Sequence, residues 1–89
     1  MIESAIVIKN RTGLHARAAA KFVEAVSAYA SSVEISNGDR KADGKSILSV
    51  MMLAASPGSE LTLTINGEDE TEALQAIKDL VENNFGEEA

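Results

Sequence analysis

The sequence predicts an α+β fold, an open-faced β-sandwich in which a four-stranded antiparallel sheet carries three helices on one face. Strand-like and helix-like apolar patterns alternate in the order βαββαβα, and the strands alternate apolar with polar residues, so one sheet face is covered and the other is wet. Two connections of helix length fit a split βαβ arrangement, in which a further strand lies between two parallel ones. The 89 residues include 26 apolar residues larger than alanine and no linker, which suffices for one small core. We therefore expect a single domain over residues 1–89.

The chain begins with a strand and a helix. Residues 2–8 are rich in β-branched side chains and predict a strand, and residues 10–13 predict a loop. From Ala16 to about Ala28, apolar residues recur at helical spacing. They form one stripe for burial, made of Ala19, Phe22, Val23 and Val26.

A hairpin is expected next. Val33 and Ile35 alternate with polar residues in a second strand. Asn37-Gly38 supplies left-handed turn geometry, so residues 39–43 should return as a short partner strand, which Gly44 ends.

The last three elements are a short helix, a strand and a longer helix. The short helix runs from Lys45 or Ser46 to Leu53 and ends in a turn at residues 56–58, and residues 61–66 alternate as a half-buried strand. The last helix begins near Asp69, which forms an expected capping box with Glu72, and ends near Asn84. Its inward residues are expected to be Leu74, Ile77, Leu80 and Val81.

Composition excludes several classes of function. A net charge of -6, with 3% aromatic residues and no Trp, argues against nucleic-acid binding. With no Cys and one His, the chain lacks the ligands of a typical zinc site, and we expect neither a metal nor a cofactor. Because the longest apolar run has six residues and no export signal is recognisable, we expect a cytoplasmic protein that does not bind membranes. We also expect a monomer.

The second helix contains more apolar surface than two helical turns can bury on a sheet. Its apolar residues form two stripes, Val50 and Leu53 on one, and Ile47, Leu48, Met51 and Met52 on the other. An apolar arc of roughly 100° suffices for burial, so one stripe is surplus. Methionines suit an adaptable contact surface, although they also fill gaps in cores. We interpret the stripe of four residues as a small docking patch for a transient partner.

The only histidine, His15, lies where the first loop turns into the first helix, between Arg11 and Arg17. A helix start presents unpaired N–H groups and the positive end of the helix dipole, which favour an anion. Neutral imidazole is a competent nucleophile, and arginine donates charge-assisted hydrogen bonds to phosphoryl oxygens. The arrangement favours a phosphoryl group carried on His15. The alternative is an ordinary surface histidine beside arginines.

Two motifs resemble one known family. The run from Gly13 to Ala19 (Gly-Leu-His-Ala-Arg-Ala-Ala) resembles the active-site motif of HPr, the histidine-containing phosphocarrier of the bacterial phosphoenolpyruvate phosphotransferase system. Residues 44–53 resemble the second helix of that family and the serine before it. The length, the element order and the approach to the last helix at residues 67–70 also match, so the resemblance covers almost the whole chain.

The resemblance implies a stoichiometric phosphoryl carrier that is not itself an enzyme. His15 would accept a phosphoryl group on Nδ1 from phosphorylated enzyme I, which obtains it from phosphoenolpyruvate, and would pass it to an enzyme IIA domain. Arg17 and the N–H groups that begin the helix, at Ala16, Arg17 and Ala18, would hold the group. The docking surface would consist of Ile47, Leu48, Met51 and Met52.

The family also suggests a regulatory site. Ser46 matches the serine that HPr kinase/phosphorylase modifies in some bacteria, and a phosphate there would put negative charge beside the docking patch. The simpler interpretation is that Ser46 is a plain N-cap.

One residue departs from the family pattern, because Ala18 stands where the family usually has proline. Alanine restores a backbone N–H in the first turn and removes the stiffness of the proline ring, which would retune the stability of the phosphohistidine. Sugar uptake and a regulatory role in the nitrogen-related branch both stay open, since they use the same chemistry. A non-catalytic module that binds through the second helix alone is a further alternative, against which His15 with Arg17 argues. An independent enzyme would need a second titratable catalytic group.

Overall fold

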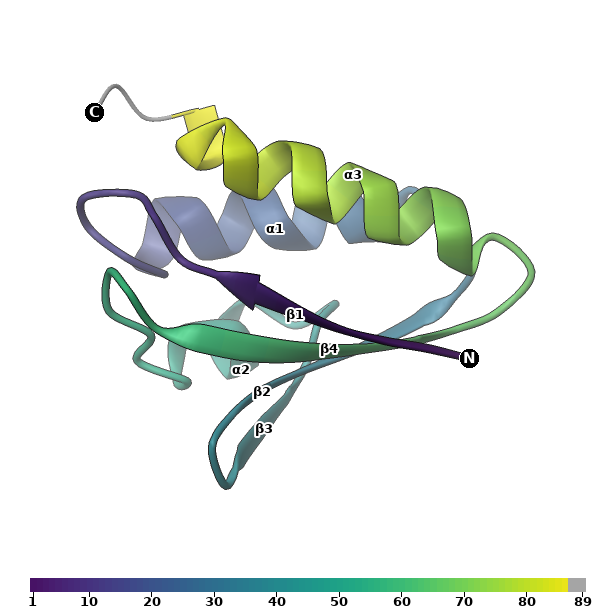
Figure 1. Ribbon diagram of the computed structural model, residues 1–89, viewed down its shortest axis with the longest axis horizontal. Helices are drawn as coiled ribbons and strands as arrows, with labels where there is room; N and C mark the ends of the chain where they lie inside the picture. The colour runs from purple at the N-terminus through teal and green to yellow at the C-terminus, as the bar shows by residue number, and fades with distance from the viewer. Residues whose placement is uncertain (87–89) are drawn as a thin grey trace.

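The computed structural model describes residues 1–86, and within them strands and helices follow the predicted order (Figure 1). The elements are β1 (Ile2–Val7), α1 (Ala16–Ser27), β2 (Ser32–Asn37), β3 (Arg40–Asp43), α2 (Ile47–Met51), β4 (Glu60–Asn66), α3 (Glu70–Glu82) and a closing 3-10 turn, η1 (Asn84–Gly86). The predicted α+β class is confirmed. Among these residues, no helix has the length and apolar character needed to cross a bilayer.

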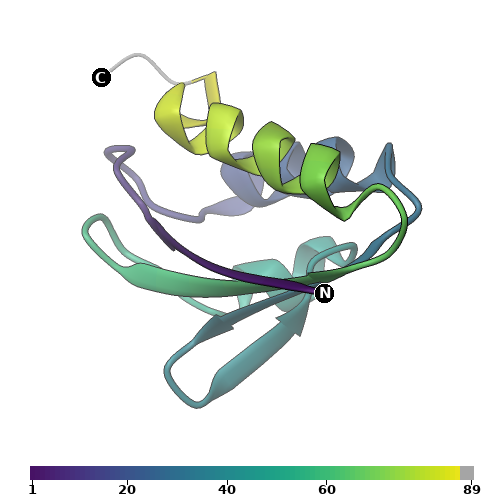
Figure 2. The same cartoon turned by 45° about the vertical axis from the view of Figure 1, so that its right-hand side comes forward.

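The strands form one sheet in the order β1-β4-β2-β3, and every neighbouring pair is antiparallel. β1 and β2 therefore run parallel to each other with β4 between them, which is the split arrangement expected from the sequence. Figure 2 shows α1 and α3 side by side above one face of this sheet. None of the helices within residues 1–86 covers the opposite face of the sheet.

The core lies between the sheet and the helices. In β4 the side chains of Leu61, Leu63 and Ile65 are buried, and the threonines between them are half-buried. The helices meet these strands through Ala18, Ala19, Phe22 and Val26 of α1, Val50 of α2, and Ala73, Ile77 and Val81 of α3. The partly buried Val23, Leu74 and Leu80 pack against the same cluster. Each large apolar side chain buried in this way contributes about 1.5–3 kcal/mol of transfer free energy, so the one-sided pattern of the strands determines where the helices lie.

The β2–β3 turn differs by one residue from the prediction. Asn37 is the last residue of β2 and pairs with Arg40, so the two-residue loop is Gly38-Asp39 rather than Asn37-Gly38. Only Gly38 has a positive φ there, +62°. The side chain of Asn37 instead donates from Nδ2 to the carbonyl oxygen of Leu53 at 3.1 Å, which holds this residue in the strand.

The predicted capping box at the start of α3 is wrong, although the helix begins where expected. Asp69 is the N-cap residue, but its side chain makes no capping hydrogen bond. Its carboxylate accepts hydrogen bonds from the backbone N–H of Ala30 at 2.8 Å, from the N–H of Ser31 at 2.9 Å and from the Ser31 hydroxyl. The hydroxyl, followed by the Ala30 N–H, lowers the pKa of Asp69. Three donors on the α1–β2 connection outcompete the single N–H that a capping box would offer.

The ends of two helices, α2 and α3, also differ from the prediction. α2 is regular only over Ile47–Met51, because Ser46 has an extended backbone (φ -116°) and Ala54 turns left-handed (φ +52°). After α3, Asn84 and Phe85 both take positive φ values, and this reversal buries Phe85.

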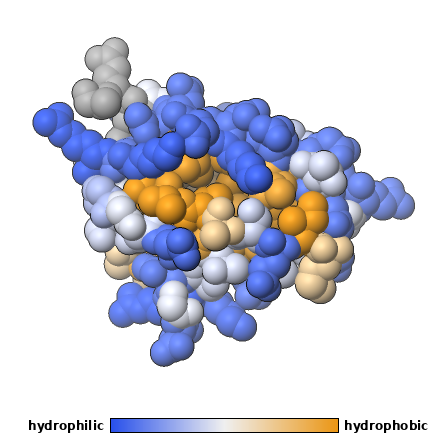
Figure 3. All heavy atoms as spheres, in the orientation of Figure 1, coloured by the Kyte–Doolittle hydropathy of each residue, from blue (hydrophilic) through white to orange (hydrophobic). Residues whose placement is uncertain are grey.

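Figure 3 shows apolar surface between the charged outer side of α3 and the edge of the sheet. A shallow groove there is lined by Ala5, Ile6 and Val7 of β1, by Val81 and polar or charged side chains of α3, and by Lys9, which follows β1. The Nζ of Lys9 and Oε1 of Glu82 form an ion pair of 2.7 Å across this groove.

Candidate functional site

The loop between β1 and α1 is fixed by backbone contacts with the segment before β4. The N–H of Leu14 donates to the carbonyl oxygen of Ala55 at 2.9 Å. Gly13 is left-handed (φ +68°), and a Cβ at this position would lie 2.4 Å from the same oxygen. Only glycine fits there, so the loop and the Ala55 segment approach as closely as two backbones can.

His15 is the N-cap residue of α1. Its backbone is extended (φ -76°, ψ -179°), and its carbonyl oxygen accepts from the N–H of Ala19 at 2.8 Å. Its Nδ1 accepts from the backbone N–H of Arg17 at 3.3 Å. Because Nδ1 is an acceptor, its lone pair points toward the start of the helix, and in the neutral ring the proton resides on Nε2. The partly exposed imidazole therefore presents a nucleophilic nitrogen at the positive end of a helix of 12 residues.

The first N–H groups of α1 follow directly after His15. Those of Ala16, Arg17 and Ala18 have no intrahelical acceptor, as at the start of any helix, and that of Arg17 donates to Nδ1 of His15. Ala18 is fully buried and Arg17 is exposed. Within residues 1–86 the Arg17 guanidinium forms no ion pair. A backbone donor and the positive end of a helix dipole meet at one nucleophile, and an exposed cationic side chain lies two residues further on, which is an arrangement that suits a tetrahedral dianion.

The second predicted feature, the surplus apolar stripe, is exposed as the spacing predicted. Ile47, Leu48, Met51 and Met52 are 43%, 67%, 37% and 66% exposed, and we call these four residues the α2 patch. Val50 and Leu53, on the other stripe, are buried. The α2 patch holds four of the six large exposed hydrophobic side chains in the described chain. Because α2 packs against α1, the patch belongs to the helical side of the molecule that carries His15.

Ser46 is the N-cap of α2. Its Oγ accepts from the N–H of Ser49 at 3.3 Å, which agrees with the simpler of its two sequence interpretations. The Nζ of the adjacent Lys45 donates a hydrogen bond to the carbonyl oxygen of Tyr29 at 2.9 Å. The hydroxyl is partly exposed at the start of the α2 patch.

Sequence reasoning missed two groups that hold these features in place. Asn10 is buried and donates from Nδ2 to the carbonyl oxygen of Gly13 at 2.7 Å. Arg40 donates from Nη1 to the carbonyl oxygen of Met52 at 3.2 Å, and together with Asn37 it secures the end of α2. An asparagine in the loop that follows a strand is a signal for a side-chain turn, which would have identified Asn10.

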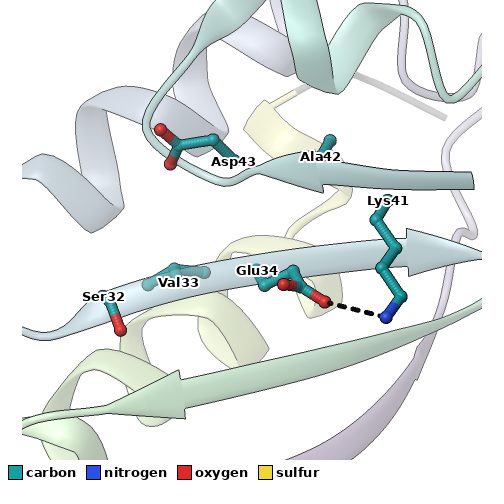
Figure 4. A pocket seen from close by; sticks show the side chains of 6 residues that line it. All are labelled: Ser32, Val33, Glu34, Lys41, Ala42 and Asp43. Atoms are coloured by element: carbon teal, nitrogen blue, oxygen red, sulfur yellow. Dashed lines mark ion pairs between the residues drawn. The ribbon is translucent and has the colours of Figure 1, made fainter.

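A hollow of about 430 Å³ on the open face of the sheet lies outside this site. Figure 4 shows its lining, made of Ser32, Val33, Glu34, Lys41, Ala42 and Asp43. Lys41 and Glu34 point toward each other, with 3.9 Å between Nζ and Oε1. None of the residues singled out from the sequence as site residues lines it. In residues 1–86, no three His, Cys, Asp or Glu side chains gather as a metal site.

Comparisons with known proteins agree with the site. A family model described as the PTS HPr component phosphorylation site matches residues 2–83. The phosphocarrier protein HPr of Xylella fastidiosa (strain 9a5c) is 44% identical over 88 residues, 99% of each chain. That of Pseudomonas aeruginosa is 51% identical over 83 residues, 92% of each.

Solved structures agree as well. The crystal structure of HPr-C-His from Thermoanaerobacter tengcongensis superposes with a TM-score of 0.94 at 45% identity, covering 100% of both chains. HPr from Bacillus anthracis str. Ames gives a TM-score of 0.85 at 32% identity, covering 90% of this chain and 95% of its own. The chain therefore belongs to the HPr family, the phosphocarrier proteins of the phosphotransferase system.

Proposed function

We propose that the 89-residue chain acts in the cytoplasm as one monomeric phosphocarrier domain that takes a phosphoryl group from phosphorylated enzyme I on His15 and gives it to an enzyme IIA domain. The observation that carries the proposal is the direction of Nδ1, which accepts from the Arg17 N–H and so faces the first turn of α1. The chain is a substrate of its partners and no enzyme by itself.

The transfer is a substitution at phosphorus. The Nδ1 lone pair of His15 forms the new N–P bond, and the bond between phosphorus and the donor group of enzyme I breaks, with its electron pair remaining on the donor. Nε2 keeps its proton, so the phosphorylated ring is cationic until that proton passes to water. A cationic ring is a good leaving group, and this favours onward transfer to enzyme IIA by the same reaction.

The start of α1 stabilises the charge on the group. Once Nδ1 is bonded to phosphorus it no longer accepts from Arg17, and the phosphoryl oxygens take over that N–H and the N–H of Ala18. The exposed Arg17 guanidinium adds charge-assisted hydrogen bonds. The N–H of Ala16 is the third backbone donor proposed for the phosphoryl oxygens.

The α2 patch is the proposed docking surface for enzyme I and enzyme IIA. It lies on the helical side with His15, and its two methionines can adapt to both partners. Met51→Glu should raise the KM for transfer and leave the fold intact. Val7→Glu is the matched control, because Val7 is 42% exposed, close to the 37% of Met51, and lies in β1, the edge strand opposite to the β3 edge that α2 contacts. Equal KM values for the two variants would remove the patch from the proposal.

Ser46 is the proposed site of regulation by HPr kinase/phosphorylase. A phosphate on its Oγ would stand at the start of the α2 patch and repel acidic partners. Incubation with this kinase and ATP should modify the wild type and leave Ser46→Ala unmodified, and the modified protein should accept phosphoryl from enzyme I more slowly. A Ser46→Ala variant that is still modified would locate the site elsewhere.

The proposed function is tested with phosphoenolpyruvate and a catalytic amount of enzyme I. Intact mass should increase by one phosphoryl group in the wild type, the adduct should be acid-labile, and His15→Ala should show no increase. An unmodified wild type beside an enzyme I that phosphorylates another HPr would refute the proposal.

A further inference from the structure

A buried polar side chain lies in the loop ahead of His15. Asn10 is 1% exposed, and Ser31 is the other polar residue that is buried among residues 1–86. Removing an amide from water is unfavourable unless it is hydrogen-bonded. The Nδ2 of Asn10 donates to the carbonyl oxygen of Gly13 at 2.7 Å, and the N–H of Gly13 donates to the carbonyl oxygen of Asn10 at 3.3 Å. The loop is thus closed by both the side chain and the backbone of one residue.

The peptide that joins Gly13 to Leu14 is held at both of its polar atoms. Its oxygen accepts from Asn10, and its N–H donates to the carbonyl oxygen of Ala55. The two partners come from different segments, one on each side of the peptide in the sequence. Because a peptide is planar, fixing its oxygen and its N–H fixes the plane in which the chain enters Leu14, the residue before His15.

The imidazole depends on this support. The hydrogen bond from the Arg17 N–H to Nδ1 is 3.3 Å long, beyond the usual 2.9–3.0 Å, so it is a weak bond and the place of the ring also depends on the backbone that carries it. The backbone at His15 sets the direction in which the side chain leaves the chain, and the Gly13–Leu14 peptide, one residue earlier, orients that backbone. In group transfer, a misplacement of about 1 Å can slow the reaction about a hundredfold.

We propose that Asn10 is a positioning residue for phosphoryl transfer, which acts by orienting the Gly13–Leu14 peptide and through it Nδ1 of His15. The inference rests on the proposed role of His15 as the phosphoryl acceptor. It assigns Asn10 no contact with the phosphoryl group.

The test compares two Asn10 variants with a control. Asn10→Ala removes the donor, and Asn10→Asp keeps the shape while replacing the donor with an acceptor. Ser31→Ala is the matched control, because it also removes a buried hydrogen bond but lies beyond the other end of α1. Circular dichroism first establishes which variants are folded.

Transfer from phosphorylated enzyme I is then measured at varied carrier concentration. The Asn10 variants should lose about ten- to a hundredfold in kcat at an unchanged KM, because the α2 patch is untouched. For Ser31→Ala, both kcat and KM should stay within about twofold of the wild-type values. A folded Asn10 variant that transfers at the wild-type rate, or slows only as much as Ser31→Ala, would overturn the inference.

A second readout needs no phosphoryl transfer. In the unphosphorylated protein, the NMR shifts of the Arg17 amide and the His15 ring nitrogens should change in Asn10→Ala and stay at wild-type values in Ser31→Ala. Unchanged shifts in both would count against positioning. A wild type that accepts no phosphoryl group would refute the proposed function instead, while these shifts would still report on Asn10.

Discussion

Replacing Gly13 by alanine tests whether the close approach of two backbones holds the His15 loop. Gly13 has a φ of +68°, and an added Cβ would lie 2.4 Å from the carbonyl oxygen of Ala55. Gly38 is the natural control, because its φ of +62° is nearly the same and a Cβ added there would meet no atom within 4 Å. The two variants therefore share the backbone penalty and differ only in the clash.

The magnitudes follow from this comparison. A left-handed alanine costs about 1–2 kcal/mol, and the lower entropy of the unfolded chain returns about 0.4–1 kcal/mol, so Gly38→Ala should lose about 1 kcal/mol of unfolding free energy. In Gly13→Ala the loop at Gly13 and the segment at Ala55 must also move apart, so the 2.9 Å hydrogen bond from the Leu14 N–H to the Ala55 carbonyl oxygen is lost. That bond adds about 1 kcal/mol, for a total of about 2 kcal/mol.

Urea unfolding measures the difference. With an m-value of about 1 kcal/mol per M, the midpoint of Gly13→Ala should lie about 1 M below that of Gly38→Ala. Gly13→Ala should also accept phosphoryl groups more slowly, because Leu14 leads directly into His15, whereas Gly38→Ala should react normally. Equal midpoints for the two variants would refute the reasoning.

Three further predictions concern other positions. Ala54→Gly should raise the unfolding free energy by about 0.5–1 kcal/mol, because Ala54 has a φ of +52°, and an unchanged urea midpoint would contradict this. The pKa of Asp69 is lowered in the folded state, chiefly by the Ser31 hydroxyl, so its stabilisation is present above the unfolded value of 3.8 and is lost as the pH falls through the folded pKa. Asp69→Asn should therefore flatten the acid limb of stability against pH, and an unaltered limb would exclude Asp69 as its source. Ala18→Pro should fold, because proline is tolerated in a first helical turn, and its phosphohistidine should hydrolyse faster for want of one N–H donor, which ³¹P NMR can follow.

Periodicity predicted the elements whose apolar residues face a single core. β4 is the clearest case, since the alternation of Leu61, Leu63 and Ile65 determines which side of the strand the helices cover. The exposure of the α2 patch was predictable for the same reason, because a short helix cannot bury two stripes. His15 stood out through its position at a helix start beside an arginine.

Features that depend on distant partners were not predictable in the same way. Asp69 and Glu72 have the spacing of a capping box, but the carboxylate of Asp69 binds Ser31, 38 residues earlier in the chain. The burial of Phe85 depends on two left-handed residues that no local pattern requires. A turn at Asn10 has a local signal, but no local pattern indicates that Ala55 binds the N–H of the same peptide whose oxygen Asn10 binds.

The central claim is that the phosphoryl group is attached to Nδ1 of His15 and lies over the first turn of α1. NMR of the ¹⁵N-labelled protein after phosphorylation by enzyme I and phosphoenolpyruvate tests it directly. Coupling to phosphorus should appear at Nδ1, and the amide signals of Arg17 and Ala18 should shift strongly as their N–H groups bind the phosphoryl oxygens. Phosphorus coupled to Nε2, or attached at Nδ1 with both amide signals unmoved, would contradict the account.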